Sequence, residues 1–349
     1  MGQPDPTPLF TPANRAHAPR VMVIAEVGVN HDGDPTRANQ LLRAAADAGA
    51  DAVKFQLFRP DRLLSAAARL AIYQDGQADD AHALLSTLTL PLDAMADLRG
   101  TAKRLGLTFI VTPFSLGDVA DLAALDVDAV KIASPDAVNT PLLDAAAKLG
   151  KPMIVSTGTC ELDELDAAAR VAQATGGALL QCVSAYPTPD RAAGLGGMAA
   201  IRDRFPGVAV GYSDHTAALD TGALAVAAGA VVLEKHLTHD RAAPGPDHAA
   251  SLEPPDFTAY VAAVRRASSM LGPATKTCTP RERDVQQVSR QSVCLTRDLP
   301  AGHVLTPKDL DVKRPGTGVP ASQLSRIVGR TLARAVKADH PLQPDDLRA

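Results

Sequence analysis

Two short stretches of the chain place polar, chemically competent side chains at the end of an apolar run. The stretch "GYSDHT" contains Ser213 and His215, and the stretch "VVLEKHLT" contains Glu234 and His236. Two imidazoles at matching depth on neighbouring strands would form half of a catalytic site for a divalent metal, with water or substrate completing the shell. Ordinary core or surface histidines, bonded to nearby carboxylates, are the alternative interpretation.

Two lysines lie inside apolar runs that leave little room to reach water, Lys54 in "AVKFQ" and Lys131 in "AVKIAS". Because burial of an unpaired ammonium group is costly, each lysine requires an anionic partner. Two such lysines in one place indicate a phosphate or carboxylate ligand, which hydroxyls such as those of Thr112, Ser134 and Ser213 would help to hold. Structural ion pairs remain the alternative, since they also draw lysines inward.

Two other segments are open to both a structural and a functional interpretation. Glu26 ends the apolar run in "IAEVGVNHDGD" and is either a counter-ion for one of the lysines or a catalytic carboxylate. The residues that follow it, 30–33, form turns. Asp247 and His248 lie in the Pro/Gly-rich loop "APGPDH", where they serve either as ligands or as turn and cap residues.

The elements that must position these residues alternate from Val21 onward. Short apolar runs are typical of buried parallel strands: "VMVIAEVG", "DAVKFQLF", "LTFIVTPF", "DAVKIAS", "PMIVSTG", "ALLQCVSAYP", "VAVGYSDH" and "VVLEKHL". Between them lie Ala- and Leu-rich stretches with helical spacing, several of which end in Gly. Eight strand–helix units within about 250 residues predict a (β/α)8 barrel, the TIM-barrel fold.

A doubly wound open sheet would show the same alternation of strands and helices. The barrel is favoured because polar residues gather at or just past the carboxyl ends of the apolar runs: Glu26, Lys54, Thr112, Lys131, Ser134, Thr157, Tyr186, Ser213, His215, Glu234 and His236. In a barrel these ends converge on one mouth, whereas in an open sheet they would spread along an edge. We therefore expect eight strands to supply one pocket.

Changes in composition along the sequence predict four segments. Residues 1–20 are polar and Pro-rich and are expected to form a flexible arm, followed by the barrel over residues 21–272. Residues 273–289 form a polar linker, and residues 290–349, with short β-like runs and Pro/Gly turns, form a small β-rich second domain. A domain of this size has a thin core, so we expect it to lean on another surface.

The composition argues against several classes of protein. A formal charge of −4, with 21% charged residues of mixed sign, gives no basic footprint for nucleic acid and no polybasic surface for a membrane. The chain shows neither a signal peptide nor an apolar run long enough to span a bilayer, which points to the cytoplasm. Four widely spaced cysteines are expected to be reduced, buried thiols: Cys160, Cys182, Cys278 and Cys294.

A series of motifs in this order resembles the sialic acid synthase (NeuB) family: "IAEVGVNHDGD", "ADAVKFQLF", "VTPF", "VKIASPDAVNTPLL", "VSTG", "CVSAYPTP", "GYSDHT", "EKHLT" and "GPDHAASLEP". The later motifs "LPAGHVLTPKDL" and "KRPGTGVP" resemble the antifreeze-like SAF domain that these synthases carry. The resemblance extends from about residue 21 to the end of the chain.

The resemblance implies a transferase that condenses phosphoenolpyruvate with the open-chain aldehyde of an N-acylated hexosamine, either N-acetylmannosamine or a 6-deoxy-diacetamido sugar. The product would be a nine-carbon 2-keto-3-deoxy acid of the sialic or legionaminic type, with release of phosphate. By the same resemblance, phosphoenolpyruvate would be held by Lys54, Thr112, Lys131, Ser134, Ser184 and Ser213. The sugar would be contacted by Gln56, Asp136, Tyr186, Asp247 and Arg314.

The resemblance also implies that His215 and His236 bind a divalent metal, Mn²⁺ with Mg²⁺ or Co²⁺ as alternatives, and that Glu26 and Glu234 are the catalytic carboxylates. In this family the arginine matched by Arg314 reaches into the barrel of the partner subunit. A domain-swapped homodimer is therefore implied.

Two departures from the family pattern bear on the substrate. Pro135 replaces a common Gly and Ser184 replaces an Asn of some members, so the turn that presents Asp136 and one phosphate contact are both altered. These changes leave the reaction type in place but not the choice of sugar. A phosphorylated sugar, as in 9-phosphate synthases, is one alternative acceptor, and a catalytically silent carbohydrate-binding SAF protein is the other alternative.

Overall fold

The computed structural model describes residues 21–65, 67–68 and 80–348, so the arm expected over residues 1–20 lies outside the described residues. Eight parallel strands close into a barrel in the order of the sequence, which confirms the barrel and excludes the open sheet. The strands are β1 (Met22–Gly28), β2 (Ala52–Leu57), β3 (Thr108–Pro113), β4 (Ala129–Ile132), β5 (Met153–Ser156), β6 (Ala178–Cys182), β7 (Ala209–Asp214) and β8 (Val232–His236).

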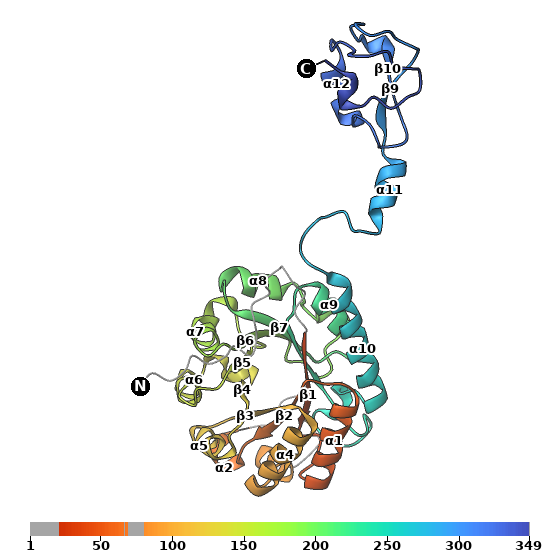
Figure 1. The fold of residues 1–349 in the computed structure, drawn as a ribbon. Helices are drawn as coiled ribbons and strands as arrows, with labels where there is room; N and C mark the ends of the chain where they lie inside the picture. Colours follow the sequence, from red (N-terminus) through yellow and green to blue (C-terminus); the bar gives the residue numbers. More distant parts are fainter. Residues whose placement is uncertain (1–20, 66, 69–79, 349) are drawn as a thin grey trace. The chain divides into compact units, whose positions relative to one another are not determined.

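Helices surround the strands on the outside of the barrel (Figure 1). They are α1 (Pro35–Asp47), α2 (Pro60–Leu63), α3 (Ala81–Thr87), α4 (Leu92–Leu105), α5 (Leu116–Leu125), α6 (Thr140–Ala147), α7 (Asp166–Ala174), α8 (Gly197–Arg204), α9 (Thr221–Ala227) and α10 (Pro254–Leu271). Local signals set their ends. The carboxylate of Asp34 caps α1 by accepting from the Thr36 amide, and α4 ends at Gly106, which has φ 74°.

The strands face two different environments on alternate residues, as the pleat of a strand requires. Inside the barrel, an apolar layer that includes Ile24, Ile110 and Ile154 fills the amino-terminal end. Two residues further along β1 and β2 the inward side chains become polar, as at Glu26 and Lys54. The apolar layer therefore forms a floor, and the polar side chains stand above it at the carboxyl ends of the strands.

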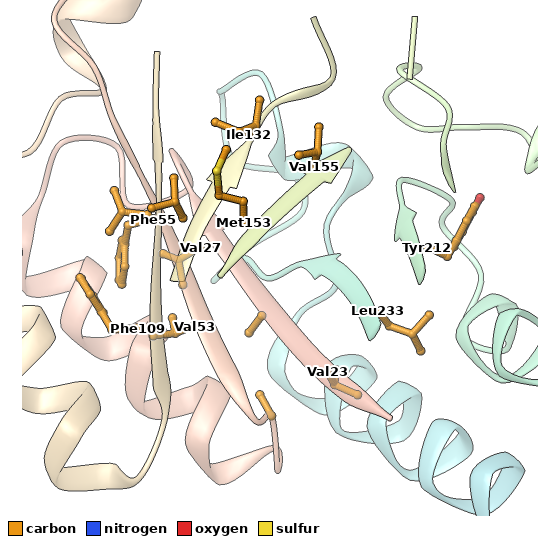
Figure 2. Packing of buried hydrophobic residues seen from close by; sticks show 14 of the residues in the cluster. Val23, Val27, Val53, Phe55, Phe109, Ile132, Met153, Val155, Tyr212 and Leu233 are labelled. Carbon is orange, nitrogen blue, oxygen red and sulfur yellow. The ribbon is translucent and has the colours of Figure 1, made fainter. Parts of the chain in front are cut away.

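The outward side chains of the same strands form the larger core between barrel and helices. Val53 and Phe55 flank Lys54 in the sequence, yet they belong to this outer core (Figure 2). Phe55 packs against Phe109 of the next strand with ring centroids 5.6 Å apart. Because each strand is buried on both faces, its apolar run is nearly continuous, and this run made the strands visible in the sequence.

The chain divides into two compact units, with the boundary between Ala274 and Thr275. The segment expected to be a linker contains α11 (Glu282–Ser289), none of whose residues is buried. The second unit has a two-stranded antiparallel sheet, β9 (Ser292–Leu295) and β10 (Leu310–Lys313), short 3-10 turns and α12 (Leu324–Ile327). Its small apolar core includes Val293, Leu305 and Leu342.

The second unit is built from two matching halves that the sequence analysis did not detect. Residues 295–310 and 332–347 share the pattern Leu-x-Arg-x₃-Ala-x-His-x-Leu-x-Pro-x-Asp-Leu. Leu299 and Val336, at equivalent positions, exchange backbone hydrogen bonds of 2.9 and 3.0 Å. Each half also closes its turn with a capping box and an Arg–Asp ion pair. The two halves thus pair across a local pseudo-twofold axis.

The four cysteines do not all behave as expected. Cys182 and Cys294 are buried, but Cys160 is only partly buried and Cys278 is exposed, so the prediction that all four are buried is wrong. Cys278 lies in the polar stretch before α11, where neighbouring apolar side chains that could cover it are lacking. All four are free thiols. Among the described residues, no helix has the length and apolar character that crossing a bilayer requires.

Candidate active site

A cavity of about 460 Å³ opens at the carboxyl ends of the barrel strands. The residues that the sequence assigned to phosphoenolpyruvate all line it: Lys54, Thr112, Lys131, Ser134, Ser184 and Ser213. The remaining assigned residues of the barrel that line it are Glu26, Gln56, Tyr186, His215, Glu234, His236 and Asp247. Strands distant in the sequence therefore supply one site.

Two assigned sugar contacts lie outside this wall. Asp136 belongs to a 3-10 turn after β4, and its Oδ1 accepts a hydrogen bond of 3.0 Å from Asn139. Pro135 lines the cavity in its place, which follows from the departure noted in the sequence. Arg314 belongs to the second unit, where it is exposed and directly follows β10.

Lys54 lies between two buried carboxylates. Its Nζ is 3.3 Å from Oε2 of Glu26 and 3.2 Å from Oε1 of Glu234. Gln56 donates a hydrogen bond of 2.8 Å to the other oxygen of Glu26, and Ser213 donates one of 3.0 Å to Glu234. Glu26 is therefore a counter-ion of Lys54, and it also lines the cavity.

Lys131 completes the charged cluster from the opposite side. Its Nζ donates to Oγ of Ser156 at 2.6 Å and lies 3.8 Å from Oε1 of Glu234. The sequence placed Thr157 at this mouth, but its hydroxyl bonds the Leu180 carbonyl, and Ser156 lines the cavity instead. Side chains alternate along a strand, so the choice between Ser156, the last residue of β5, and Thr157 directly after it depends on register that the sequence does not reveal.

Burial and nearby charges give the carboxyl groups of Glu26 and Glu234 different pKa values. Burial raises the pKa of Glu26 to about 7, against the attraction of Lys54. Burial would also raise the pKa of Glu234, but Lys131 and Lys54 outweigh it and lower that pKa to about 2. Near neutral pH, Glu26 therefore exchanges a proton readily while Glu234 stays ionised, a division typical of acid–base pairs.

The cluster is suited to an anion when Glu26 carries its proton. Two ammonium groups then face one carboxylate, although burial lowers the pKa of Lys131 to about 8. The hydroxyl of Thr112 is buried and has no hydrogen-bond partner among the described residues, so it is available to a ligand. A buried cavity with excess positive charge and a free donor favours a phosphate or carboxylate group.

Gly158 brings the backbone close to the hydroxyls on this side of the cavity. Its amide donates to Oγ of Ser134 at 3.0 Å. A Cβ at this position would lie 2.4 Å from Oγ of Ser184, so only glycine fits. The residue is part of the motif "VSTG", but its role becomes visible only once β5 and β6 are placed side by side.

The two histidines meet as expected from adjacent strands. The rings of His215 and His236 are 5.3 Å apart, and the ring of Tyr186 lies 4.1 Å from that of His215. Nδ1 of His215 is 2.8 Å from the Val183 carbonyl oxygen, which fixes its orientation. Nδ1 of His236 is buried with no hydrogen-bond partner, and Oδ2 of Asp247 lies 3.6 Å away.

This donor set fits a divalent ion that takes part of its shell from elsewhere. Burial, followed by the proximity of His215, lowers the pKa of His236 well below its usual value, so its imidazole is neutral, as a metal ligand must be. Within residues 21–65, 67–68 and 80–348, however, no group of three or more His, Cys, Asp or Glu side chains is arranged to hold a metal by itself. Water or substrate would have to supply the remaining ligands.

An apolar wall, which sequence reasoning missed, faces the polar cluster. It consists of residues that follow β1, β2 and β3 and of residues in α2 and in or directly after α3: Val29, Phe58, Leu63, Leu85, Leu88 and Phe114. Because these residues come after the strand ends, they lie nearer the mouth than Glu26 or Lys54. A search for chemically reactive residue types could not have found them.

The fold and the site define a (β/α)8-barrel protein with a cation-lined, anion-accepting cavity beside a histidine pair. The chain belongs to the NeuB family, whose model matches residues 41–276, and it carries a SAF domain at residues 290–348. It is 37% identical to the N,N'-diacetyllegionaminic acid synthase of Legionella pneumophila, over 94% of each chain.

Other relatives differ in the activity that their names state. The chain is 31% identical to the human N-acetylneuraminate-9-phosphate synthase, over 93% of this chain and 91% of that one. The crystal structure of the N-acetylneuraminic acid synthetase of Leptospira borgpetersenii superimposes with a TM-score of 0.69 at 31% identity, covering 77% of this chain and 90% of that one.

Proposed function

We propose that this protein is a metal-dependent synthase that condenses phosphoenolpyruvate with an N-acylated hexosamine to a nine-carbon 2-keto-3-deoxy acid of the sialic or legionaminic type. The observation that carries the proposal is the single cavity in which Lys54 and Lys131 lie beside the histidine pair. Membership of the NeuB family and the names of the relatives support it. As a phosphoenolpyruvate-consuming enzyme it would work in the cytoplasm.

The residues of the chain have distinct tasks in this reaction. Lys54 and Lys131 would bind the phosphate of phosphoenolpyruvate, with Thr112, Ser134, Ser184 and Ser213 as hydrogen-bond partners. A divalent ion, Mn²⁺ with Mg²⁺ or Co²⁺ as alternatives, would be held by His215 and His236 and would polarise the aldehyde oxygen of the sugar as a Lewis acid.

Carbon 3 of phosphoenolpyruvate then bonds to carbon 1 of the aldose, and positive charge develops at carbon 2. Glu234, which is ionised, would stabilise this charge. Glu26, which carries its proton when the anion is bound, would give that proton to the oxygen at carbon 1 and would then accept one from the water that adds at carbon 2. The hydroxyl at carbon 2 would then become the ketone as the bond between carbon 2 and the phosphate oxygen breaks, its proton would pass to the leaving phosphate, and the two lysines would stabilise that phosphate.

The cavity favours an unphosphorylated acceptor. Among its described lining residues, the side chains with a fixed positive charge are Lys54 and Lys131, which the phosphate of phosphoenolpyruvate already requires. The apolar part of the wall, with Phe58, Leu88 and Phe114, would pack against acetyl or deoxy-methyl groups. A phosphorylated sugar would need a second cationic cluster, so it is the weaker candidate.

Mass spectrometry of the product tests this proposal directly. The enzyme is incubated with phosphoenolpyruvate, Mn²⁺ and one of three acceptors: N-acetylmannosamine, its 6-phosphate, or a 2,4-diacetamido-2,4,6-trideoxyhexose. We expect phosphate release and a nine-carbon acid with an unphosphorylated acceptor. Turnover confined to the 6-phosphate would reassign the acceptor, and binding of sugars without any phosphate release would favour the catalytically silent alternative.

We also propose a domain-swapped homodimer in which Arg314 reaches the partner's cavity. The charge distribution supports such docking, since residues 290–349 carry ten Lys and Arg but six Asp and Glu, while the whole chain carries 35 and 39. The Arg314→Ala variant is expected to raise the KM for the sugar about tenfold or more in a folded dimer. Mixed dimers with Lys131→Met, which is defective in the barrel, should recover activity. Absence of recovery would contradict the trans-subunit role.

A further inference from the structure

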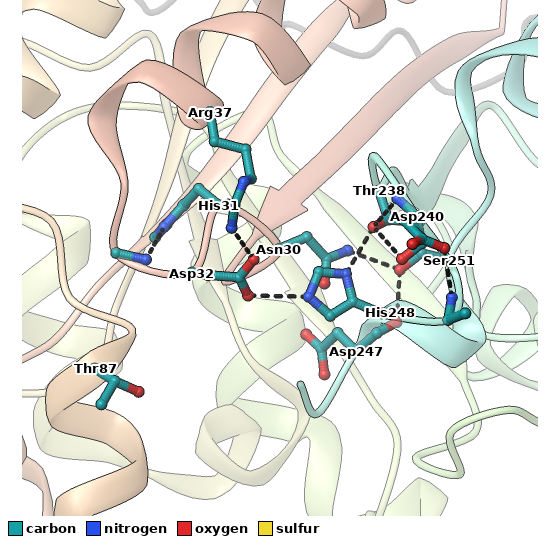
Figure 3. Close-up of polar contacts among 12 residues, drawn as sticks. Asn30, His31, Asp32, Arg37, Thr87, Thr238, Asp240, Asp247, His248 and Ser251 are labelled. Carbon is teal, nitrogen blue, oxygen red and sulfur yellow. Dashed lines mark hydrogen bonds and ion pairs between the residues drawn. The ribbon is translucent and has the colours of Figure 1, made fainter. Parts of the chain in front are cut away.

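Two loops on either side of the β1–β8 seam contain several polar residues to which no role has yet been given, together with Asp247. The loop after β1 carries "NHDG" at residues 30–33, and the loop after β8 carries "GPDHAAS" at residues 245–251. β1 and β8 pair in parallel, with Glu26 opposite His236. The two loops therefore start side by side, and Figure 3 shows their polar side chains converging.

Asn30 joins the two loops at the base. Its side-chain amide, Nδ2, donates to the Leu237 carbonyl at 3.0 Å and to Oγ of Ser251 at 2.8 Å. The hydroxyl of Ser251 in turn donates to the carbonyl of Asp247 at 2.6 Å. Asn30 and Ser251 are both buried, so water cannot readily replace these bonds (Figure 3).

His248 joins the same loops a second time. Its Nε2 is 2.9 Å from Oδ1 of Asp32, and its Nδ1 is 2.7 Å from Oγ1 of Thr238. The other oxygen of Asp32 is paired with Arg37. The backbone of Gly245 passes close to this imidazole, because a Cβ there would lie 2.6 Å from Cδ2 of His248. The imidazole is thus fixed on both ring nitrogens and covered by the loop.

We propose that Asn30, Asp32, Thr238, His248 and Ser251 form a loop clamp whose function is to position Asp247 in the cavity. None of the five lines the cavity, whereas Asp247 does. Asp247 is the residue immediately before His248, and its backbone carbonyl is held by Ser251. These five are positioning residues, because their own side chains stay outside the cavity and hold the loop that carries Asp247.

The geometry explains why Asp247 needs such support. Its carboxylate lies 3.6 Å from the unpartnered Nδ1 of His236, on a loop rich in Pro and Gly that forms no strand and only a one-turn 3-10 helix at His248–Ala250. A short loop with few apolar anchors opens easily, and a side chain displaced by about 1 Å loses much of its effect on a bound substrate. The hydrogen bonds of the loop clamp supply such anchors by holding the loop after β8 to the barrel.

Amide hydrogen exchange tests the clamp without any need for turnover. In the Asn30→Ala variant, amides of residues 239–251 should exchange about tenfold faster, while strands β2 to β6 keep their protection. Asn39→Ala, the same substitution in α1, is the matched control and should leave the loop unchanged. A loop that stays protected in Asn30→Ala, or a loss of protection spread evenly over the barrel, would overturn the clamp whether or not the proposed reaction is correct.

Kinetics then separate positioning from general stability, and this second test rests on the proposed function. Asn30→Ala should raise the KM for the sugar about tenfold or more, with little change in the KM for phosphoenolpyruvate. Asn30→Asp keeps the shape but sets a carboxylate oxygen against the Leu237 carbonyl, so its loss should be at least as large. In an Asp247→Ala background, Asn30→Ala should add almost nothing. Full additivity of the two substitutions would show that Asn30 does not act through Asp247.

Discussion

The Lys54→Met variant is expected to release phosphate from phosphoenolpyruvate about a thousandfold more slowly than the natural enzyme. Among the residues that the structure describes, Lys54 is the cation paired with both Glu26 and Glu234, at 3.3 and 3.2 Å. Methionine keeps most of the volume but removes the charge, so the substrate phosphate loses a partner. The same change leaves Glu26 without its ion-pair partner, so burial and the charge of Glu234 drive it further toward its protonated form, while Glu234 keeps Lys131 as its counter-ion.

Steady-state phosphate release and calorimetric titration with phosphoenolpyruvate measure these two losses separately. The matched control is Lys235→Met, because Lys235 is equally buried and paired with Asp214 at 3.3 Å, but on the outer face of the barrel. Each substitution breaks a buried ion pair and should lower the free energy of unfolding by about 3–5 kcal/mol. The activity of the folded fraction of Lys235→Met should stay within tenfold of the activity of the natural enzyme. Equal activity losses in the two variants would mean that Lys54 is structural.

The barrel could be predicted from the sequence because its strands are buried on both faces. An apolar run such as "VMVIAEVG" has no competing interpretation when a helical stretch with a cap follows it, and eight such units close in only a few ways. The short helices α2 and α3 were not predicted, since four and seven residues are too few for a periodic signal. The repeated halves of the second unit share residue types at the same spacing, so the sequence carries their signal, and the pairing of Leu299 with Val336 shows how the two halves are arranged.

The candidate site was predicted from residue types, and the structure brings most of the residues chosen in this way into one cavity. Lys54 and Lys131, inside apolar runs, face the polar cavity, whereas Lys235 in the run of β8 is buried on the outer face and paired with Asp214, so a buried charge needs a partner but does not by itself reveal its side of the strand. Three kinds of information were missing. Register decided between Ser156 and Thr157, apolar lining residues carry no chemical signature, and the role of Asn30 depends on a partner more than two hundred residues away.

Removal of divalent metal by EDTA is expected to abolish phosphate release, and the His236→Ala variant should behave in the same way at metal concentrations that just saturate the natural enzyme. Nδ1 of His236 is buried with no hydrogen-bond partner, 3.6 Å from Asp247 and in a ring 5.3 Å from that of His215. An unpartnered polar atom costs about 1–3 kcal/mol when buried, so its retention indicates a ligand that the protein binds. Without the ion the aldehyde would lack its Lewis-acid partner, and carbon 3 of the enol phosphate would be too weak a nucleophile to attack it.

Binding of Mn²⁺, followed by electron paramagnetic resonance, provides a readout that does not depend on turnover. Natural enzyme should bind the ion, and His236→Ala should bind it about a hundredfold more weakly while its circular dichroism is unchanged. His303→Ala is the control, because that imidazole pairs with Asp309 in the second unit, outside the cavity. Activity lost to EDTA should return with Mn²⁺, Mg²⁺ or Co²⁺ to different extents, which identifies the preferred ion. Undiminished turnover in protein whose metal content has been measured as negligible would contradict the role given to the histidine pair.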